Sequence, residues 1–266
     1  MIKQILNCLT MELPWSDHFI WYDETDSTNT RAKALAAAGA PHGTVLIADR
    51  QTGGRGRSGR RFLSPSSMGV YMSVILRPDC PPDQLMHLTC AAAVAMCDAV
   101  EQAAGFRPGI KWTNDLVARK KKLAGILTEL SLDPATGKVA YAVIGIGINC
   151  CQTSDDFAEE IRPIAGSLSM IAGREISRPQ LAAAMVEALY RMDASLLTQK
   201  ETIMHRYQQD CITVGCEVCV LRGDSVRRGK AVGIDPDGAL LVEFTPGQTE
   251  TVNSGEVSVR GLYGYV

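Results

Sequence analysis

The sequence has little excess charge and no long apolar run. Its 266 residues include 27 Lys and Arg against 29 Asp and Glu, a formal net charge of −2. A protein that coats nucleic acid needs a broad basic face, so this balance argues against that class. No stretch reaches the roughly 18 apolar residues of a membrane-spanning helix, and Asn7, Thr10 and Glu12 make the opening segment a poor signal peptide. We therefore expect a cytoplasmic protein that binds neither nucleic acid nor membrane.

Cysteine and histidine are present, but without the spacing of disulfide frameworks or metal sites. Nine Cys in this length is an odd number and a low density, which is typical of reduced thiols. The pair Cys216 and Cys219 lacks the two further ligands that a structural zinc ion needs. We expect these residues to be ordinary buried or surface side chains.

Several catalytic signatures are also missing. The sequence contains no G-x-x-x-x-G-K-[ST] phosphate loop, no G-x-S-x-G nucleophile elbow and no kinase motif set. Nothing marks a Ser, Cys or Thr as a nucleophile with a His base. The chemistry is therefore expected to depend on positioning anions and stabilising charge.

The order of apolar patterns predicts a mixed α/β fold with two domains. Residues 1–212 alternate strand-like runs with helical segments at 31–38, 85–104 and 179–197. Residues 213–266 consist of short Val and Leu runs separated by turn signals, which is typical of a small antiparallel barrel. We place the boundary between the two domains near Ile212.

The segment from Gly54 to Arg61 is the most unusual part of the sequence. Residues 50–61 hold five Arg and no acid, and the glycines at 54, 56 and 59 let the backbone approach a ligand closely. Guanidinium groups bind carboxylate and phosphate in bidentate fashion, so we expect a mobile loop that closes over an anionic ligand. The match to G-x-G-x-x-G is not followed by a helix, which argues against a dinucleotide fold. The alternative is a solvated basic loop without a ligand.

A second polar and basic segment runs from Lys111 to Gly125. Asn114 and Asp115 could hold a phosphate, a ribose or a metal ion, or they could form an ordinary turn. Lys122 enters an apolar strand, where a partly buried ammonium group needs an anionic partner.

Six segments together resemble biotin–protein ligases in order and spacing. They are D-S-T-N at 26–29, R-Q at 50–51, G-R-G-R-S-G-R at 54–60, K-W-T-N-D at 111–115, K-L-A-G at 122–125 and G-I-G-I-N at 145–149. The resemblance covers about residues 20 to 266 and suggests the short form without an N-terminal DNA-binding domain. It implies a mixed sheet with helices, as in class II aminoacyl-tRNA synthetases, followed by an SH3-like barrel.

The resemblance also implies the site residues. The expected biotin-binding residues are Ser27, Thr28, Asn29, Gln51, Arg55, Gly56, Arg57 and Lys122. The expected ATP-binding residues are Arg57, Arg60, Phe62, Lys111, Asn114 and Asn149, with Asp115 as a Mg²⁺ ligand. The expected catalytic residues are Arg57, Lys111 and Lys122.

The implied reaction uses biotin and ATP with Mg²⁺, forms biotinyl-5′-AMP, and modifies a lysine of a biotin carboxyl carrier protein or domain. A homodimer is compatible with the family. The alternatives are a lipoate or octanoate ligase or transferase on a related fold, and a binding module without catalysis. Thr113 departs from the K-W-P-N-D pattern usual in the family, and we expect a less rigid ATP site as a result.

Overall fold

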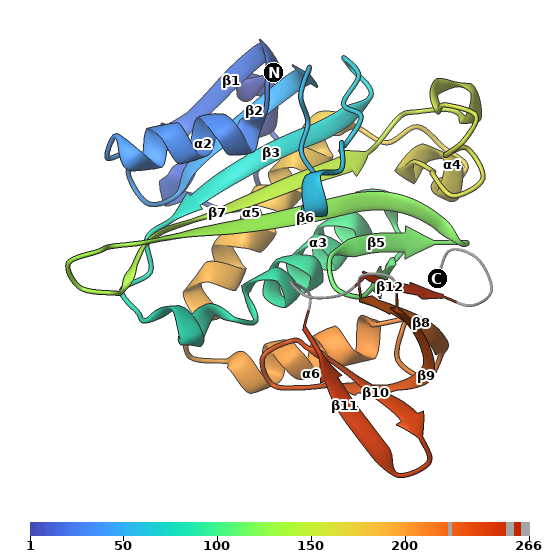
Figure 1. Cartoon of the computed structure of the whole chain (residues 1–266). Coiled ribbons are helices and arrows are strands. Elements are labelled where there is room, and N and C mark those ends of the chain that lie inside the picture. The colour runs from blue at the N-terminus through green and yellow to red at the C-terminus, as the bar shows by residue number, and fades with distance from the viewer. Residues whose placement is uncertain (223–224, 254–257, 262–266) are drawn as a thin grey trace.

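The computed structural model describes residues 1–222, 225–253 and 258–261, and its centre is a seven-stranded mixed sheet in the order β1-β2-β3-β7-β6-β5-β4 (Figure 1). The strands are β1 (Phe19–Thr25), β2 (Thr44–Gln51), β3 (Gly69–Leu76), β4 (Gly109–Lys111), β5 (Asp115–Ala118), β6 (Lys121–Leu132) and β7 (Val139–Asn149). Only the β1–β2 pair is parallel, and the other five pairs are antiparallel.

Helices cover the sheet on both sides. The helices are α1 (Ile2–Leu6), α2 (Thr28–Ala37), α3 (Leu88–Ala104), α4 (Leu168–Ala172), α5 (Arg178–Ser195) and α6 (Lys200–Asp210). Figure 1 shows α3 and α5 behind the sheet and α2 in front of it. The alternation of side chains along each strand explains the two layers: Val45 and Ile47 of β2 join the core under α3 and α5, whereas Leu46 packs under α2.

A second, antiparallel sheet of five strands follows α6, in the order β11-β10-β9-β8-β12. Its strands are β8 (Glu217–Arg222), β9 (Ser225–Ile234), β10 (Leu240–Thr245), β11 (Gln248–Val252) and β12 (Ser258–Gly261). The turn between β9 and β10 contacts the connection between β4 and β5, because the indole N–H of Trp112 donates to the carbonyl oxygen of Gly238 at 2.8 Å.

Several helix boundaries differ from the sequence-based prediction. The helix expected at 31–38 begins at Thr28, because Ser27 is extended and serves as its N-cap residue. The helix expected from residue 85 begins at Leu88, after a 3-10 turn at Pro82–Leu85. The helix expected at 179–197 is α5, and the hydroxyl of Ser177 accepts a hydrogen bond from the Gln180 N–H, as a cap should. Helix α6 was not predicted, since its surface is mostly polar.

Within the described residues, none of the helices combines the length and apolar character needed to cross a lipid bilayer.

Candidate active site

The N-terminus of α2 brings three of the expected biotin-binding residues into the sheet. Ser27, Thr28 and Asn29 are all buried. The backbone N–H and the hydroxyl of Thr28 both donate to Oε1 of Gln51, at 2.8 and 3.1 Å. Gln51 in turn donates from Nε2 to the Ser64 hydroxyl at 2.8 Å. The end of β2 and the start of α2 therefore form one hydrogen-bonded cluster.

Asn29 joins this cluster to the middle of the sheet. Its Oδ1 accepts from the Ser73 hydroxyl at 2.6 Å, and its Nδ2 donates to the Leu127 carbonyl at 3.2 Å and to Glu129 Oε2 at 3.1 Å. The absence of a side chain at Gly145 makes this possible, because a Cβ there would lie 1.7 Å from Asn29 Oδ1. The amide is thus fixed by three protein groups on two strands, β3 and β6.

Glu129 is a site residue that the sequence analysis missed. Its carboxylate accepts from Lys33 Nζ at 2.7 Å and from Arg55 Nη1 at 3.1 and 3.2 Å, in addition to the contact with Asn29. Burial alone would raise the pKa of Glu129, but the hydrogen bonds from Lys33 and Asn29 and the charge of Arg55 lower it below its usual value. A sequence signal existed, since Glu129 is the sole charged residue between Lys122 and Asp133.

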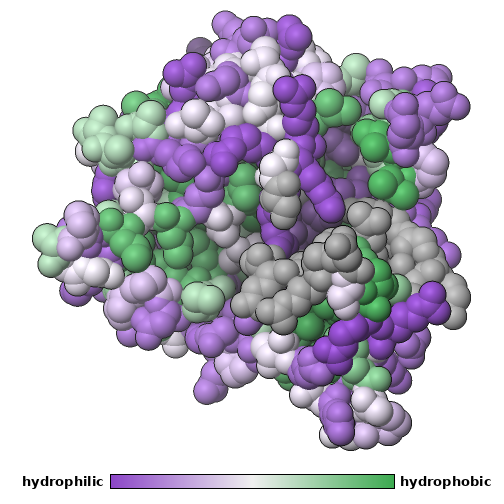
Figure 2. Space-filling model, viewed as in Figure 1, coloured by the Kyte–Doolittle hydropathy of each residue, from purple (hydrophilic) through white to green (hydrophobic). Residues whose placement is uncertain are grey.

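The Gly- and Arg-rich loop between β2 and β3 lies over this side of the sheet. It contains a 3-10 turn at Arg57–Gly59, and the backbone N–H of Gly56 donates to the Arg60 carbonyl at 2.8 Å. On the face seen in Figure 2, hydrophilic side chains gather over this loop and continue into the middle of the face. Arg60 lies on the exposed side of the loop, whereas Arg57 is half-buried.

Arg57 reaches from the loop to the segment between β4 and β5. Its Nη1 donates to Thr113 Oγ1 at 2.6 Å and to Asn114 Oδ1 at 2.9 Å. Burial lowers the pKa of Arg57, while the nearby Asp115 carboxylate opposes that shift, and the guanidinium remains charged. The structure therefore joins two motifs that lie 56 residues apart, as the interpretation of a shared anion site requires.

Lys122 has the anionic partner that its position in the sequence requires. Its Nζ lies 2.6 Å from Oδ1 of Asp115, across the β5–β6 pair. Lys111 is opposite Asp115 in the β4–β5 register, and Asn114 Nδ2 donates to the Ile126 carbonyl at 2.9 Å. The polar residues of K-W-T-N-D and the lysine of K-L-A-G thus form one group.

Phe62 packs on glycines at the centre of the sheet. A Cβ at Gly147 would lie 2.5 Å from the Phe62 ring, and a Cβ at Gly125 would lie 3.6 Å from the ring and 3.5 Å from Lys122 Nζ. The ring also meets Tyr71 edge to face, with centroids 6.4 Å apart. The glycines of K-L-A-G and G-I-G-I-N therefore form a flat floor, with Phe62 and Lys122 above it.

Asn149 lies at the end of β7 and is connected to the same group through one residue. Its Nδ2 donates to the Gly166 carbonyl at 3.0 Å, and the Gly166 N–H donates to the Lys122 carbonyl at 2.9 Å. All six sequence motifs thus meet on one side of the large sheet, the side that carries α2.

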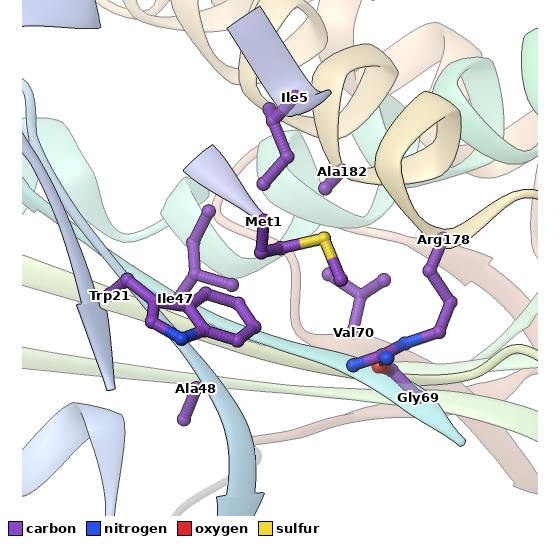
Figure 3. A pocket seen from close by; sticks show the side chains of 9 residues that line it. All are labelled: Met1, Ile5, Trp21, Ile47, Ala48, Gly69, Val70, Arg178 and Ala182. Carbon is purple, nitrogen blue, oxygen red and sulfur yellow. Dashed lines mark hydrogen bonds between the residues drawn. The ribbon is translucent and has the colours of Figure 1, made fainter. Parts of the chain in front are cut away.

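A small pocket lies apart from this group, on the sheet face covered by α5. Figure 3 shows Met1, Trp21, Val70 and Arg178 around it, with the Arg178 guanidinium beside Gly69. Its lining is mostly apolar, and none of the expected site residues contributes to it.

The described residues contain no group of three or more His, Cys, Asp or Glu placed to hold a metal ion. Asp115 contributes one carboxylate, which suits Mg²⁺ when substrate phosphates supply most of the ligands, as is usual for this ion. Its pairing with Lys122 means that an added cation must share this carboxylate with the ammonium group.

Comparisons with known proteins agree with the family resemblance. Residues 21–149 match the biotin/lipoate A/B protein ligase family, and residues 213–260 match the biotin protein ligase C-terminal domain. The chain is 38 % identical over 231 residues to the bifunctional ligase/repressor BirA of Bacillus subtilis, covering 86 % of this chain and 70 % of that protein. It is 33 % identical over 240 residues to the biotin–[acetyl-CoA-carboxylase] ligase of Mycobacterium tuberculosis, covering 88 % of this chain and 86 % of that protein.

A solved structure is similar in fold over almost its whole length. The biotin protein ligase of Aquifex aeolicus, in complex with biotin and ATP, superposes with a TM-score of 0.77 and 31 % identity, covering 92 % of this chain and 99 % of that one. Together with the two domain matches, these similarities show that the chain belongs to the biotin protein ligase family.

Proposed function

We propose that this chain activates biotin with ATP and transfers it to one lysine of a biotin carboxyl carrier protein or domain. In the first step a biotin carboxylate oxygen attacks the α-phosphorus of ATP, the bond to the β-phosphate oxygen breaks, and pyrophosphate leaves. In the second step the lysine amine attacks the acyl carbon of biotinyl-5′-AMP, AMP leaves, and the amine loses a proton.

The observation that carries this proposal is the meeting of Arg57 with Thr113 and Asn114 beside the Lys122–Asp115 pair. Two anions repel each other, so a site that joins a carboxylate to a phosphate needs fixed positive charge between them. Arg57, Lys111 and Lys122 supply cationic groups of that kind from three segments, without a protein nucleophile.

The residue roles follow from where each group lies. Ser27, Thr28, Asn29 and Gln51 present hydroxyl and amide groups suited to the ureido ring of biotin. Gly56 belongs to the loop that closes the site, and Arg55 is anchored on Glu129, so a contact of Arg55 with the biotin carboxylate requires an exchange of partners.

The nucleotide is assigned to the residues of the basic loop, the 111–114 segment and the end of β7. We assign ATP contacts to Arg57, Arg60, Phe62, Lys111, Asn114 and Asn149. Mg²⁺ is expected to enter with ATP, with Asp115 as its protein ligand.

The division of the chain is part of the proposal. We assign catalysis to 1–212 and a supporting role to the C-terminal part, 213–266. A homodimer remains part of the same hypothesis.

A direct assay tests the proposal. The protein is incubated with biotin, ATP and Mg²⁺, pyrophosphate release is followed, and the adenylate is identified by mass spectrometry. A carrier domain is then added, and its modified lysine is mapped. If lipoate reacts while biotin does not, the assignment of substrate is wrong.

A further inference from the structure

Thr113 provides an acceptor that a proline at this position could not provide. Its hydroxyl oxygen lies 2.6 Å from Nη1 of Arg57, in a side chain that is only 5 % exposed. The same guanidinium nitrogen donates to Asn114 Oδ1, so two neighbouring residues both accept hydrogen bonds from Nη1 of Arg57. Hydrogen bonds to a charged donor are shorter and stronger than neutral ones.

The position of Thr113 is set by groups outside the loop. The Tyr207 hydroxyl, from α6, donates to the Thr113 carbonyl at 2.9 Å. The preceding residue is fixed twice: the Trp112 backbone N–H donates to Thr213 Oγ1 at 3.0 Å, and the indole N–H donates to Gly238. Trp112 and Tyr207 are both buried. The backbone at Thr113 is therefore held by α6 and by the C-terminal part of the chain, and this position places the Thr113 hydroxyl beside Arg57.

The loop that carries Arg57 has few internal constraints. The described backbone hydrogen bonds within it are Gly56 N–H to Arg60 O, Arg60 N–H to Arg57 O, and Phe62 N–H to Gly54 O. Four arginines between residues 55 and 61 repel one another. A loop of this composition depends on external anchors to keep one conformation. Arg55 provides one on Glu129, at its start, and Arg57 provides another on Thr113 and Asn114, at its centre.

We propose that Thr113 is a positioning residue that anchors the 54–61 loop through Arg57, before any substrate binds. The inference rests on the proposed function only in that the loop is taken to close the ligase site. It adds to the expectation that Thr113 leaves the ATP site less rigid than proline would. The backbone at 113 loses the constraint of proline, while the hydroxyl gains a side-chain contact that orders a different segment, the 54–61 loop.

The test uses three variants of the full chain and no ligand. Thr113→Val removes the hydroxyl at nearly constant shape, and Thr113→Ser keeps it. Thr89→Val is the matched control, because Thr89 also contributes a hydroxyl hydrogen bond, to Thr128, away from the loop. Amide hydrogen exchange is measured by NMR at Gly56, Arg60 and Phe62. The internal reference is the turn where the Gly137 N–H donates to Asp133.

Thr113→Val is expected to speed exchange at the three loop amides about tenfold, since a hydrogen bond to a charged group biases an opening equilibrium by at least that factor. Exchange at Gly137 should stay unchanged, Thr113→Ser should resemble the wild type, and Thr89→Val should leave the loop unaffected. Unchanged loop exchange in Thr113→Val overturns the proposal, and so does equal acceleration in Thr113→Ser.

A second measurement connects the anchor to the reaction. If the ligase assignment holds, Thr113→Val should release biotinyl-5′-AMP faster than the wild type, while Thr113→Ser should not. The two tests fail separately: a wild type without pyrophosphate release defeats the ligase assignment and leaves the exchange result standing. Normal ligation with unchanged loop exchange in Thr113→Val defeats only the anchor.

Discussion

The ammonium group of Lys122 lies 2.6 Å from the carboxylate of Asp115. The resemblance assigns these two residues to different ligands, the biotin carboxyl and Mg²⁺, yet in the structure each neutralises the other. The side chains are 31 % and 17 % exposed, so water shields the pair only in part. A substrate or metal ion that binds to either residue must therefore break or share the existing Lys122–Asp115 ion pair.

The first prediction concerns this pair. Lys122→Ala should reduce adenylation or transfer by about 2–4 kcal/mol of transition-state stabilisation, if the ammonium stabilises developing negative charge. Asp115→Asn should be less damaging to biotin binding than to ATP use. Rapid-quench measurements of pyrophosphate release and of carrier modification separate the two steps. An unchanged kcat in Lys122→Ala would remove this residue from the mechanism.

The second prediction concerns Glu129 and pH. Glu129→Gln should lower the free energy of unfolding at pH 7 by about 2 kcal/mol, because Lys33 and Arg55 lose a charged acceptor. The folded state depresses the pKa of Glu129 below its ordinary value of 4.5, so this stabilisation is complete above that pH. The stabilisation by Glu129 should disappear as the pH falls through the depressed pKa that this residue has in the folded protein. Urea unfolding of both proteins between pH 3 and pH 7 should therefore show converging stabilities, and a constant difference would contradict the assignment.

The third prediction concerns the glycine floor. Gly145→Ala places a methyl group 1.7 Å from Asn29 Oδ1, so Asn29 must move and lose Ser73 as a donor. Overpacking of this kind costs about 1–3 kcal/mol, and we expect at least about tenfold weaker biotin binding by calorimetry. The matched control is Gly233→Ala on β9, where the new methyl group would lie at an ordinary 3.6 Å from Leu241. Equal biotin affinities in the two variants would show that Asn29 does not line the biotin pocket.

The fourth prediction concerns the ion pair between α5 and β2. Arg178 Nη2 lies 2.7 Å from Asp49 Oδ1, and the side chains are 13 % and 17 % exposed. Burial would raise the pKa of Asp49, but hydrogen bonds from Ser66 and Arg178 lower it. Arg178→Met alone should destabilise the fold by about 2 kcal/mol, since it leaves a partly buried carboxylate without its cationic partner, although Ser66 and Ser67 still donate to it.

The double variant Asp49→Asn with Arg178→Met should be more stable than Arg178→Met alone. Thermal and urea unfolding of the four proteins give the coupling free energy. Additive losses would mean that the two residues act independently.

The sequence predicts three central strands and the loop conformation of the Gly- and Arg-rich segment, because both depend on local patterns. The apolar runs at 44–48, 70–76 and 140–148 are β2, β3 and β7, and the Gly- and Arg-rich segment is a loop without an α-helix. Lys122 was expected to need an anion, and Asp115 is that anion.

The partners of Glu129 could not be predicted in the same way. Its contacts come from Lys33, Asn29 and Arg55, which are 96, 100 and 74 residues away in the chain. Only the order of strands and their register bring these groups together, and both are long-range properties. Helix α6 was missed for a different reason: apart from Ile203, Met204 and Tyr207 its residues are not buried, so its helical period is weak.

The hydrogen bond from the Trp112 indole to Gly238 has a consequence for protein engineering. Its acceptor is a main-chain oxygen, so the hydrogen bond does not depend on which side chains the β9–β10 turn carries. A comparison of side chains between family members would therefore not reveal it. A chimera that takes its C-terminal sheet from another member of the family should keep the 112–114 segment in place if the length of that turn is preserved. Inserting a single residue into the turn should disturb ATP use even when every motif is intact.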